Sequence, residues 1–252
     1  MLAVLRAALR LVALLFSLAR IAVRFRLLAF RRGSRLDLND RARWLHLSCR
    51  TVLRSLGVRP ECRGLRPVRG LVCSNHLSYL DIAVYAATLP CVFVSKVEVS
   101  RWPVFGFFAR AGGTLFIDRQ SRASTEQVAG HIAAALATGI PVLLFPEGTS
   151  TDGSAVLRFH PSLLEPAIRA EADIAAAAIA YRAADRPERD LCWFGDAPFL
   201  PHLLRTLGYR GVTATVEFYP EPAAYTDRKA AALEVQEKVE ALRKRIKTEA
   251  PS

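Results

Sequence analysis

The sequence lacks the cysteine and histidine spacings that are typical of metal-binding sites and of small secreted domains cross-linked by disulfides. It has five cysteines among 252 residues, and no two are spaced as Cys-x-x-Cys. It also lacks zinc-like His and Cys spacing, internal repeats and low-complexity linkers. These absences argue against a zinc module and a disulfide framework, and they favour free thiols in a reducing compartment. We therefore expect no metal ion and no bound cofactor. The cysteines are Cys49, Cys62, Cys73, Cys91 and Cys192.

Acidic residues are scarce in the first quarter of the chain. Residues 1–70 contain three acids and 16 basic residues, all of them arginine, whereas the other 182 residues contain 20 acids and 19 basic residues. The formal net charge of +12 therefore comes from the N-terminal part. A nucleic-acid groove spreads its cations over a folded face with aromatic residues among them. The distribution here predicts no nucleic-acid partner.

The first 35 residues lack the long uncharged run of a membrane-spanning helix. A span needs about 20 apolar residues, and the longest stretch without a charge, Leu11–Ala19, has nine. On a helix, six arginines fall within an arc of about 80°, and most of the remaining circumference is apolar. This pattern favours a helix lying in the membrane surface, with arginines extending to lipid phosphates. A tilted span and a signal peptide stay open. The six are Arg6, Arg10, Arg20, Arg24, Arg31 and Arg35.

A second helix is predicted from Asn39 to Leu56. Asn39 is a plausible N-cap, and Gly57 follows as a plausible end. The apolar face of this helix consists of Trp44, Leu45, Cys49, Val52 and Leu56. We expect the two helices to form a membrane-associating segment over residues 1–60.

The remaining residues, 61–252, show short apolar runs that alternate with helical patterns. Such alternation predicts an α/β fold with a mostly parallel central sheet covered by helices, although the alanine run 175–178 also suits a helix. The predicted strands are Leu71–Ser74, Cys91–Ser95, Thr114–Ile117, Pro141–Phe145, Ile174–Ala180 and Val212–Tyr219. The predicted helices are Ser78–Leu89, Thr125–Thr138, Ser162–Glu171 and Lys229–Lys247.

The first chemical motif is NHLSYLD, residues 75–81, directly after a predicted strand. Positions five apart on one helix differ by about 140°, so His76 and Asp81 would diverge if both were helical. Ser78 as N-cap, with Asp81 three residues on, places His76 in the preceding loop, free to fold back towards the carboxylate. A neutral, oriented histidine can deprotonate an alcohol. A histidine that only caps a helix is the plain alternative.

Two further motifs end predicted strands. GTLFIDR, residues 113–119, places Arg119 at the carboxyl edge of the sheet, where open α/β folds bind ligands and a guanidinium can bind phosphate. An ion pair with Asp118 is the alternative. FPEGTS, residues 145–150, places Glu147 in a turn, which could also be an ordinary loop. Because His76, Arg119 and Glu147 all follow strands, we expect them to converge on one edge.

The three motifs, in this order and at these approximate separations, resemble the signature blocks of the glycerolipid acyltransferase family, which includes lysophosphatidic acid acyltransferases. The resemblance runs from about residue 65 to 220. It implies that His76 and Asp81 are catalytic. It implies acceptor binding by the residues Lys96, Gly113, Phe116, Arg119, Glu147 and Gly148. One departure is Ala176, which stands where the family usually has a proline in its fourth block.

The resemblance implies transfer of an acyl group from acyl-ACP or acyl-CoA to a lysolipid hydroxyl, with His76 as general base and no covalent enzyme intermediate. Backbone N–H groups near a helix start would hold the oxyanion. Cys73 lies in a predicted strand and is expected to be a buried thiol. Lysophosphatidic acid is the first acceptor, and lyso-ornithine lipid is the second. We expect the protein at the cytoplasmic face of the cell membrane. An ester hydrolase using the same pair, and a basic membrane adaptor without activity, are the rival functions.

Overall fold

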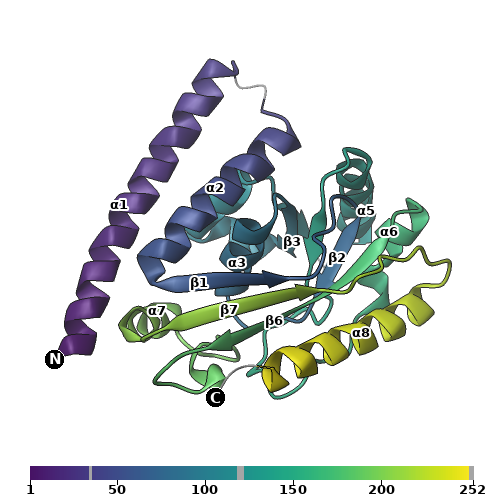
Figure 1. Ribbon diagram of the computed structural model, residues 1–252. Coiled ribbons are helices and arrows are strands. Elements are labelled where there is room, and N and C mark those ends of the chain that lie inside the picture. The colour runs from purple at the N-terminus through teal and green to yellow at the C-terminus, as the bar shows by residue number, and fades with distance from the viewer. Residues whose placement is uncertain (34–35, 118–121, 250–252) are drawn as a thin grey trace.

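Among the described residues, seven strands form one sheet in the order β1-β7-β6-β2-β5-β3-β4 (Figure 1). The structure is a computed structural model that describes residues 1–33, 36–117 and 122–249, without the side chains of 122–128. The strands are β1 (Val58–Arg63), β2 (Leu71–Ser74), β3 (Val92–Lys96), β4 (Leu115–Ile117), β5 (Val142–Leu144), β6 (Ile174–Arg182) and β7 (Val212–Phe218).

The sheet is mostly parallel, as predicted. Of its six neighbouring pairs, five run parallel, and β6 and β7 run antiparallel. Each of the six predicted strands is present. The sequence did not predict β1, which lies at one end of the strand order. This strand reads VRPECR and lacks an apolar run, and Pro60 is tolerated there because an edge strand needs fewer backbone donors.

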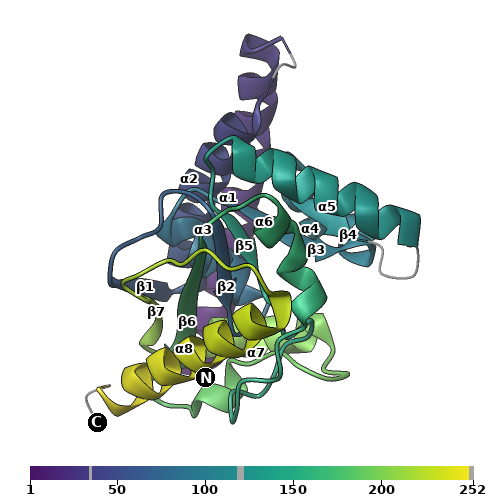
Figure 2. The ribbon, with the colours of Figure 1, turned by 90° about the vertical axis from the view of Figure 1, so that its right-hand side faces the viewer.

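Helices cover both faces of the sheet (Figure 1, Figure 2). One buried cluster joins the sheet to α2, α3 and α7, and another joins it to α5, α6 and α8. The predicted helix Ser162–Glu171 is instead a 3-10 turn followed by a short helix, because Pro166 lies in the first turn of that helix and cannot continue an earlier one. The α-helices are α1 (Leu2–Arg31), α2 (Leu38–Leu56), α3 (Leu80–Thr88), α4 (Phe105–Ala111), α5 (Arg122–Ala137), α6 (Glu165–Arg169), α7 (Phe199–Gly208) and α8 (Arg228–Thr248). The 3-10 turns are η1 (Val97–Arg101), η2 (Pro161–Leu163) and η3 (Glu188–Asp190).

Among the described helices, α1 is the one long and apolar enough to cross a membrane, by length and composition. It lies on the outside of the molecule beside α2 and α7 (Figure 1). Arg6 Nε donates to Gly208 O at 2.9 Å. Arg10 Nη1 donates to Leu207 O at 3.0 Å and Tyr209 O at 2.8 Å. These carbonyls end α7, where helix carbonyls lack partners and the dipole is negative. The prediction that the arginines reach lipid phosphates is therefore wrong for Arg6 and Arg10.

The apolar face of α1 points away from the protein. Ser17 is buried and its hydroxyl lies 2.8 Å from that of Ser55 on α2, so this side of the helix faces the body. The opposite side exposes large apolar residues, which include Leu5, Leu9, Val12, Leu15, Phe16, Val23, Leu27 and Phe30. The structure therefore leaves α1 with an unburied apolar surface along most of its length.

The second helix, α2, packs into the core instead of forming a lipid-facing platform with α1. Its apolar residues Trp44, Leu45 and Leu53 are buried in the same cluster as the sheet. Asp37, not Asn39, is the N-cap, and its carboxylate accepts from the N–H of Asp40. Gly57 ends the helix in the left-handed conformation, as predicted. The domain boundary between residues 60 and 61 stays a prediction.

Candidate active site

The loop after β2 carries His76 and is fixed by its neighbour Asn75. Asn75 is buried, and its side chain pairs with the backbone of β6 in two hydrogen bonds. Its Nδ2 donates to Ile179 O at 3.1 Å, and its Oδ1 accepts from Ile179 N at 2.9 Å. The Asn75 side chain thus continues the hydrogen bonding between β2 and β6 for one residue beyond β2. The backbone turns away from the sheet at His76.

His76 folds back over the start of α3, as predicted. Its Nδ1 lies 2.7 Å from Asp81 Oδ2, with the His76 side chain 21% exposed and that of Asp81 fully buried. Because an ionised carboxylate only accepts hydrogen bonds, Nδ1 carries the proton and Nε2 holds the lone pair. The imidazole also stacks on Phe145, with ring centroids 4.2 Å apart and 15° between the planes. The ring orientation is therefore fixed from two sides.

The carboxylate of Asp81 accepts three further hydrogen bonds. Oδ2 accepts from the N–H groups of Leu77 at 2.7 Å and Ser78 at 3.0 Å. Oδ1 accepts from the hydroxyl of Tyr181 on β6 at 2.5 Å. Two backbone donors before the helix are thus occupied by Asp81 and do not serve as oxyanion donors. Tyr181 could not be predicted as a partner of Asp81 from local sequence, because it lies one residue after the predicted strand and meets Asp81 only through the packing of the sheet.

The prediction that Ser78 is the N-cap of this helix is wrong. The helix begins at Leu80, with Tyr79 as N-cap. Among the described residues, the buried Ser78 hydroxyl has no hydrogen-bond partner. The other half of the predicted capping box is present, since the Asp81 carboxylate accepts from the N–H of Ser78. The predicted loop for His76 therefore exists, although the Ser78 hydroxyl does not cap the helix.

Glu147 supports the loop of His76 from the neighbouring strand. It follows β5, is 3% exposed, and its Oε1 accepts from His76 N at 2.7 Å. Its Oε2 accepts from Leu157 N at 2.8 Å. Burial raises the pKa of Glu147 from 4.5 to about 7, although these two backbone donors lower it. Both oxygens thus accept from backbone N–H groups, so the carboxylate holds the backbone of His76 in place, and its predicted role in acceptor binding stays a prediction.

The other predicted acceptor residues are less closely grouped. Lys96 ends β3 and is exposed, so it shares the carboxyl edge with His76 and Glu147. Gly148 follows Glu147 with a φ of +73°. Phe116 lies in β4 opposite Ser95 of β3. The structure does not bring Gly113 to this edge, because it precedes β4 and lies against α2 at the amino end of the strand. Asp118 and Arg119 lie outside the described residues.

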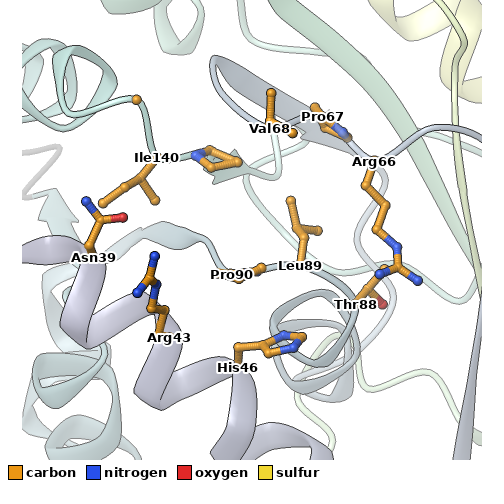
Figure 3. Close-up of a pocket in the computed structure, with 12 residues that line it drawn as sticks. Asn39, Arg43, His46, Arg66, Pro67, Val68, Thr88, Leu89, Pro90 and Ile140 are labelled. Atoms are coloured by element: carbon orange, nitrogen blue, oxygen red, sulfur yellow. The ribbon is translucent and has the colours of Figure 1, made fainter.

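A pocket of about 380 Å³ lies at the opposite edge of the sheet (Figure 3). Its walls come from α2 and from the loops that precede β2, β3 and β5. Arg43 and His46 approach it from α2, and Arg66 lies across from them. His76 follows the carboxyl end of β2, so this pocket is separate from the candidate active site.

The cysteines are not part of the site around His76. All five are free, as predicted. Cys73 in β2 is fully buried, and burial raises the pKa of its thiol well above the ordinary value. It therefore acts as a core residue and not as a nucleophile. Among the described residues, no group of three or more His, Cys, Asp and Glu side chains could hold a metal ion.

Comparison with known proteins identifies the family. A family model described as Acyltransferase matches residues 47–181, which include His76, Asp81 and Glu147. The chain belongs to the acyltransferase family. The resemblance to glycerolipid acyltransferases is thereby confirmed, and the chain is a member of a family of enzymes.

Two curated relatives carry different acceptor names. A lyso-ornithine lipid O-acyltransferase from Pseudomonas aeruginosa is 36% identical over 66% of this chain and 64% of its own length. A 1-acyl-sn-glycerol-3-phosphate acyltransferase from Neisseria gonorrhoeae is 31% identical over 68% of each chain. The chain thus spans about two thirds of the length of these relatives.

The fold also matches a solved structure. The acyltransferase PlsC from Thermotoga maritima, described as acting on 1-acyl-sn-glycerophosphate, superposes with a TM-score of 0.68. The match covers 98% of this chain and 100% of that one at 15% identity, so it shows a shared fold.

Proposed function

We propose that the protein transfers a fatty acyl group from an acyl thioester, acyl-ACP or acyl-CoA, to a free hydroxyl of a membrane lysolipid. The observation that carries this proposal is the 2.7 Å contact between His76 Nδ1 and Asp81 Oδ2, which leaves Nε2 to accept a proton. A partly exposed imidazole at the rim of the sheet suits a substrate that enters from outside.

In the proposed reaction His76 first accepts a proton from the acceptor and then donates it to the leaving group. The acceptor hydroxyl lies within about 3 Å of His76 Nε2 and attacks the thioester carbonyl while Nε2 takes its proton. Asp81 stabilises the imidazolium that forms. The tetrahedral intermediate then collapses, the C–S bond breaks, and the leaving thiolate takes the proton from Nε2. The products are an ester and a free thiol, and the histidine returns to its starting state.

The acceptor headgroup would be held at the same edge of the sheet. We assign the binding of the headgroup to Lys96, Phe116 and Gly148 and, from its motif alone, to Arg119. Gly113 would act indirectly, because its φ of +80° forms the turn that leads into β4.

We place a lyso-ornithine lipid first among acceptors, because the relative with 36% identity carries that name. Lysophosphatidic acid comes second, because the relative with 31% identity is named for it. The exposed apolar face of α1 would keep the protein at the cytoplasmic face of the membrane, where such acceptors reside.

The test is an acyl-transfer assay with purified protein in lipid vesicles. Both lysolipids are offered with acyl-ACP and with acyl-CoA, beside His76→Ala and a control variant, His131→Ala, whose histidine is exposed on α5. We expect a diacyl product from the wild type and the control, and a loss of about 10²-fold to 10⁴-fold in His76→Ala. Release of free fatty acid without diacyl product would instead establish a hydrolase. Equal activity in His76→Ala would exclude the proposed mechanism.

A further inference from the structure

Aromatic rings form a contiguous cluster beside the catalytic loop. Phe105 packs edge-on against Phe199 at 5.0 Å between centroids and against Trp102 at 6.4 Å. Trp193 packs against Trp102 at 5.9 Å and Phe199 at 6.4 Å. Trp102 follows η1 and Phe105 begins α4, whereas Trp193 precedes α7 and Phe199 begins it. They therefore join two segments that are far apart in the sequence.

The two segments that meet in this cluster also expose large apolar side chains. We call these residues the aromatic patch: Trp102, Val104 and Phe105 on one segment, and Leu200 and Leu204 on α7, the helix that begins at Phe199. Large apolar side chains exposed together on a folded protein usually mark a contact with a partner or a membrane.

The backbone at the tip of the patch is strained. Val104 has φ +65° and ψ −62°, and Phe105 N donates to Pro103 O at 2.7 Å. This is the rarer, strained form of the γ-turn, and a β-branched residue is poorly suited to it. The turn nevertheless presents a valine that is 52% exposed. Strain kept at an exposed apolar position points to a contact that the folded chain alone does not supply.

The patch is connected to the loop that carries His76. Trp193 N donates to Leu77 O at 2.8 Å, and Ser150 Oγ donates to Trp193 O at 2.5 Å. Leu77 is the residue between His76 and Ser78, and its own N–H binds Asp81. A surface that docks at the patch would therefore lie beside the segment that contacts the loop of His76.

The two helices that carry patch residues also pack against α1. Arg6 and Arg10 bind the carbonyl end of α7, the helix that carries Leu200 and Leu204. At the other end of α1, Phe25 packs edge-on against Phe107 of α4 at 6.0 Å, and α4 begins at Phe105. Both helices that carry the patch thus flank α1.

We propose that the aromatic patch is a second membrane-contact surface, which inserts at the boundary between lipid headgroups and acyl chains beside the opening at His76. The proposal rests on the proposed function. Trp and Phe suit this boundary because their rings are large and apolar, and the indole N–H can reach water. The exposed charges nearby have both signs and do not favour an acidic protein partner; they are Glu98, Arg101, Asp196 and Arg205.

The first experiment measures quenching of tryptophan fluorescence by brominated phospholipids in vesicles. Trp44 is buried and Trp193 is partly buried, whereas Trp102 is exposed. We expect quenching in the wild type and loss of most of it in Trp102→Phe. Quenching that persists unchanged in Trp102→Phe, or no quenching in the wild type, would overturn the proposal.

The second experiment compares Val104→Glu with Leu233→Glu, a matched control on α8 whose leucine is 62% exposed outside the patch. Activity is measured on a vesicle-embedded lysolipid and on a short-chain lysolipid soluble as a monomer. We expect the ratio of the first activity to the second to fall about tenfold in Val104→Glu and to stay unchanged in Leu233→Glu. Equal ratios in the two variants would contradict the proposal.

Other occupants of the patch predict different results. If a second copy of the chain covers the patch, the protein should form concentration-dependent dimers without lipid, and Val104→Glu should abolish them. If an acyl carrier protein covers it, that protein should bind without lipid and in a salt-sensitive way. Either result, together with no quenching of Trp102 by brominated lipid, would overturn the membrane proposal. Absence of acyl transfer to every acceptor, with Trp102 still quenched by brominated lipid, would refute the proposed function and leave the membrane contact standing.

Discussion

The hydroxyl of Tyr181 donates a 2.5 Å hydrogen bond to Asp81 Oδ1, across 100 positions of sequence. Burial raises the pKa of Tyr181 well above 10, and the charge of Asp81 raises it further. The hydroxyl therefore stays protonated at any working pH and always donates. Because it occupies Oδ1, the other carboxylate oxygen is left to face His76.

Removing this hydroxyl in Tyr181→Phe leaves Oδ1 buried without its side-chain donor. We expect kcat to fall about tenfold and the free energy of unfolding to fall by about 1–3 kcal/mol, the usual cost of an unsatisfied buried polar group. Steady-state kinetics and urea unfolding measure the two effects. Tyr225→Phe is the control, because its hydroxyl binds Glu234 at an exposed site. An unchanged kcat in Tyr181→Phe would show that Asp81 holds its orientation without the tyrosine.

Asp81→Asn removes the charge that we propose stabilises the imidazolium, and it replaces one of the two acceptor oxygens of this side chain by an NH2 group. We expect kcat to fall about 10²-fold or more, with a smaller change in KM. Circular dichroism shows whether the variant is folded, so that a loss of activity can be attributed to the missing charge. A folded Asp81→Asn protein with wild-type kcat would rule out the carboxylate as partner of His76.

Glu147 should make stability depend on pH. Its pKa is about 7 in the folded protein against an ordinary value of 4.5, so the folded state holds this proton more tightly than the unfolded state. The resulting stabilisation is complete below pH 4.5 and is lost as pH rises to about 7. We expect the difference in unfolding free energy between wild type and Glu147→Gln to fall by up to about 3 kcal/mol across this window.

Urea unfolding of both proteins at several pH values measures this difference, and groups common to both cancel. Glu147→Gln should also lower kcat, since glutamine replaces one of the two acceptor oxygens by an NH2 group that only donates, and one of the two backbone N–H groups then loses its acceptor. A difference that does not change with pH would mean that Glu147 ionises near its ordinary pKa.

Arg10 should fix the N-terminal half of α1 to the body. Arg10→Ala removes two hydrogen bonds to the end of α7. We expect faster proteolytic cleavage within α1 and a loss of about 1–3 kcal/mol in unfolding free energy. Arg20→Ala is the control, because this arginine is exposed and lies 5.7 Å from the ring of Phe16 on its own helix. Equal cleavage of both variants would mean that α1 is held by its apolar contacts alone.

Local features of the site were predictable because they depend on few residues. The contact between His76 and Asp81 needs one loop and one helical turn, and a spacing of five already requires the histidine to lie before the helix. The six strands were predictable because each is a short apolar run, and four of them are buried along almost their whole length. Short-range sterics and burial set these elements, and both can be derived from neighbouring residues.

The sequence by itself determined the family motifs, the alternation that produces a mostly parallel sheet, and the amphipathic pattern of α1. Only the tertiary structure decided which groups those motifs meet. The edge strand β1 depends on pairing with β7, Glu147 binds the backbone of His76 from another strand, and Arg10 binds the end of α7. All three depend on hydrogen bonds between segments that are distant in the sequence. The packing of the whole sheet decides which groups meet, and no pattern of neighbouring residues indicates it.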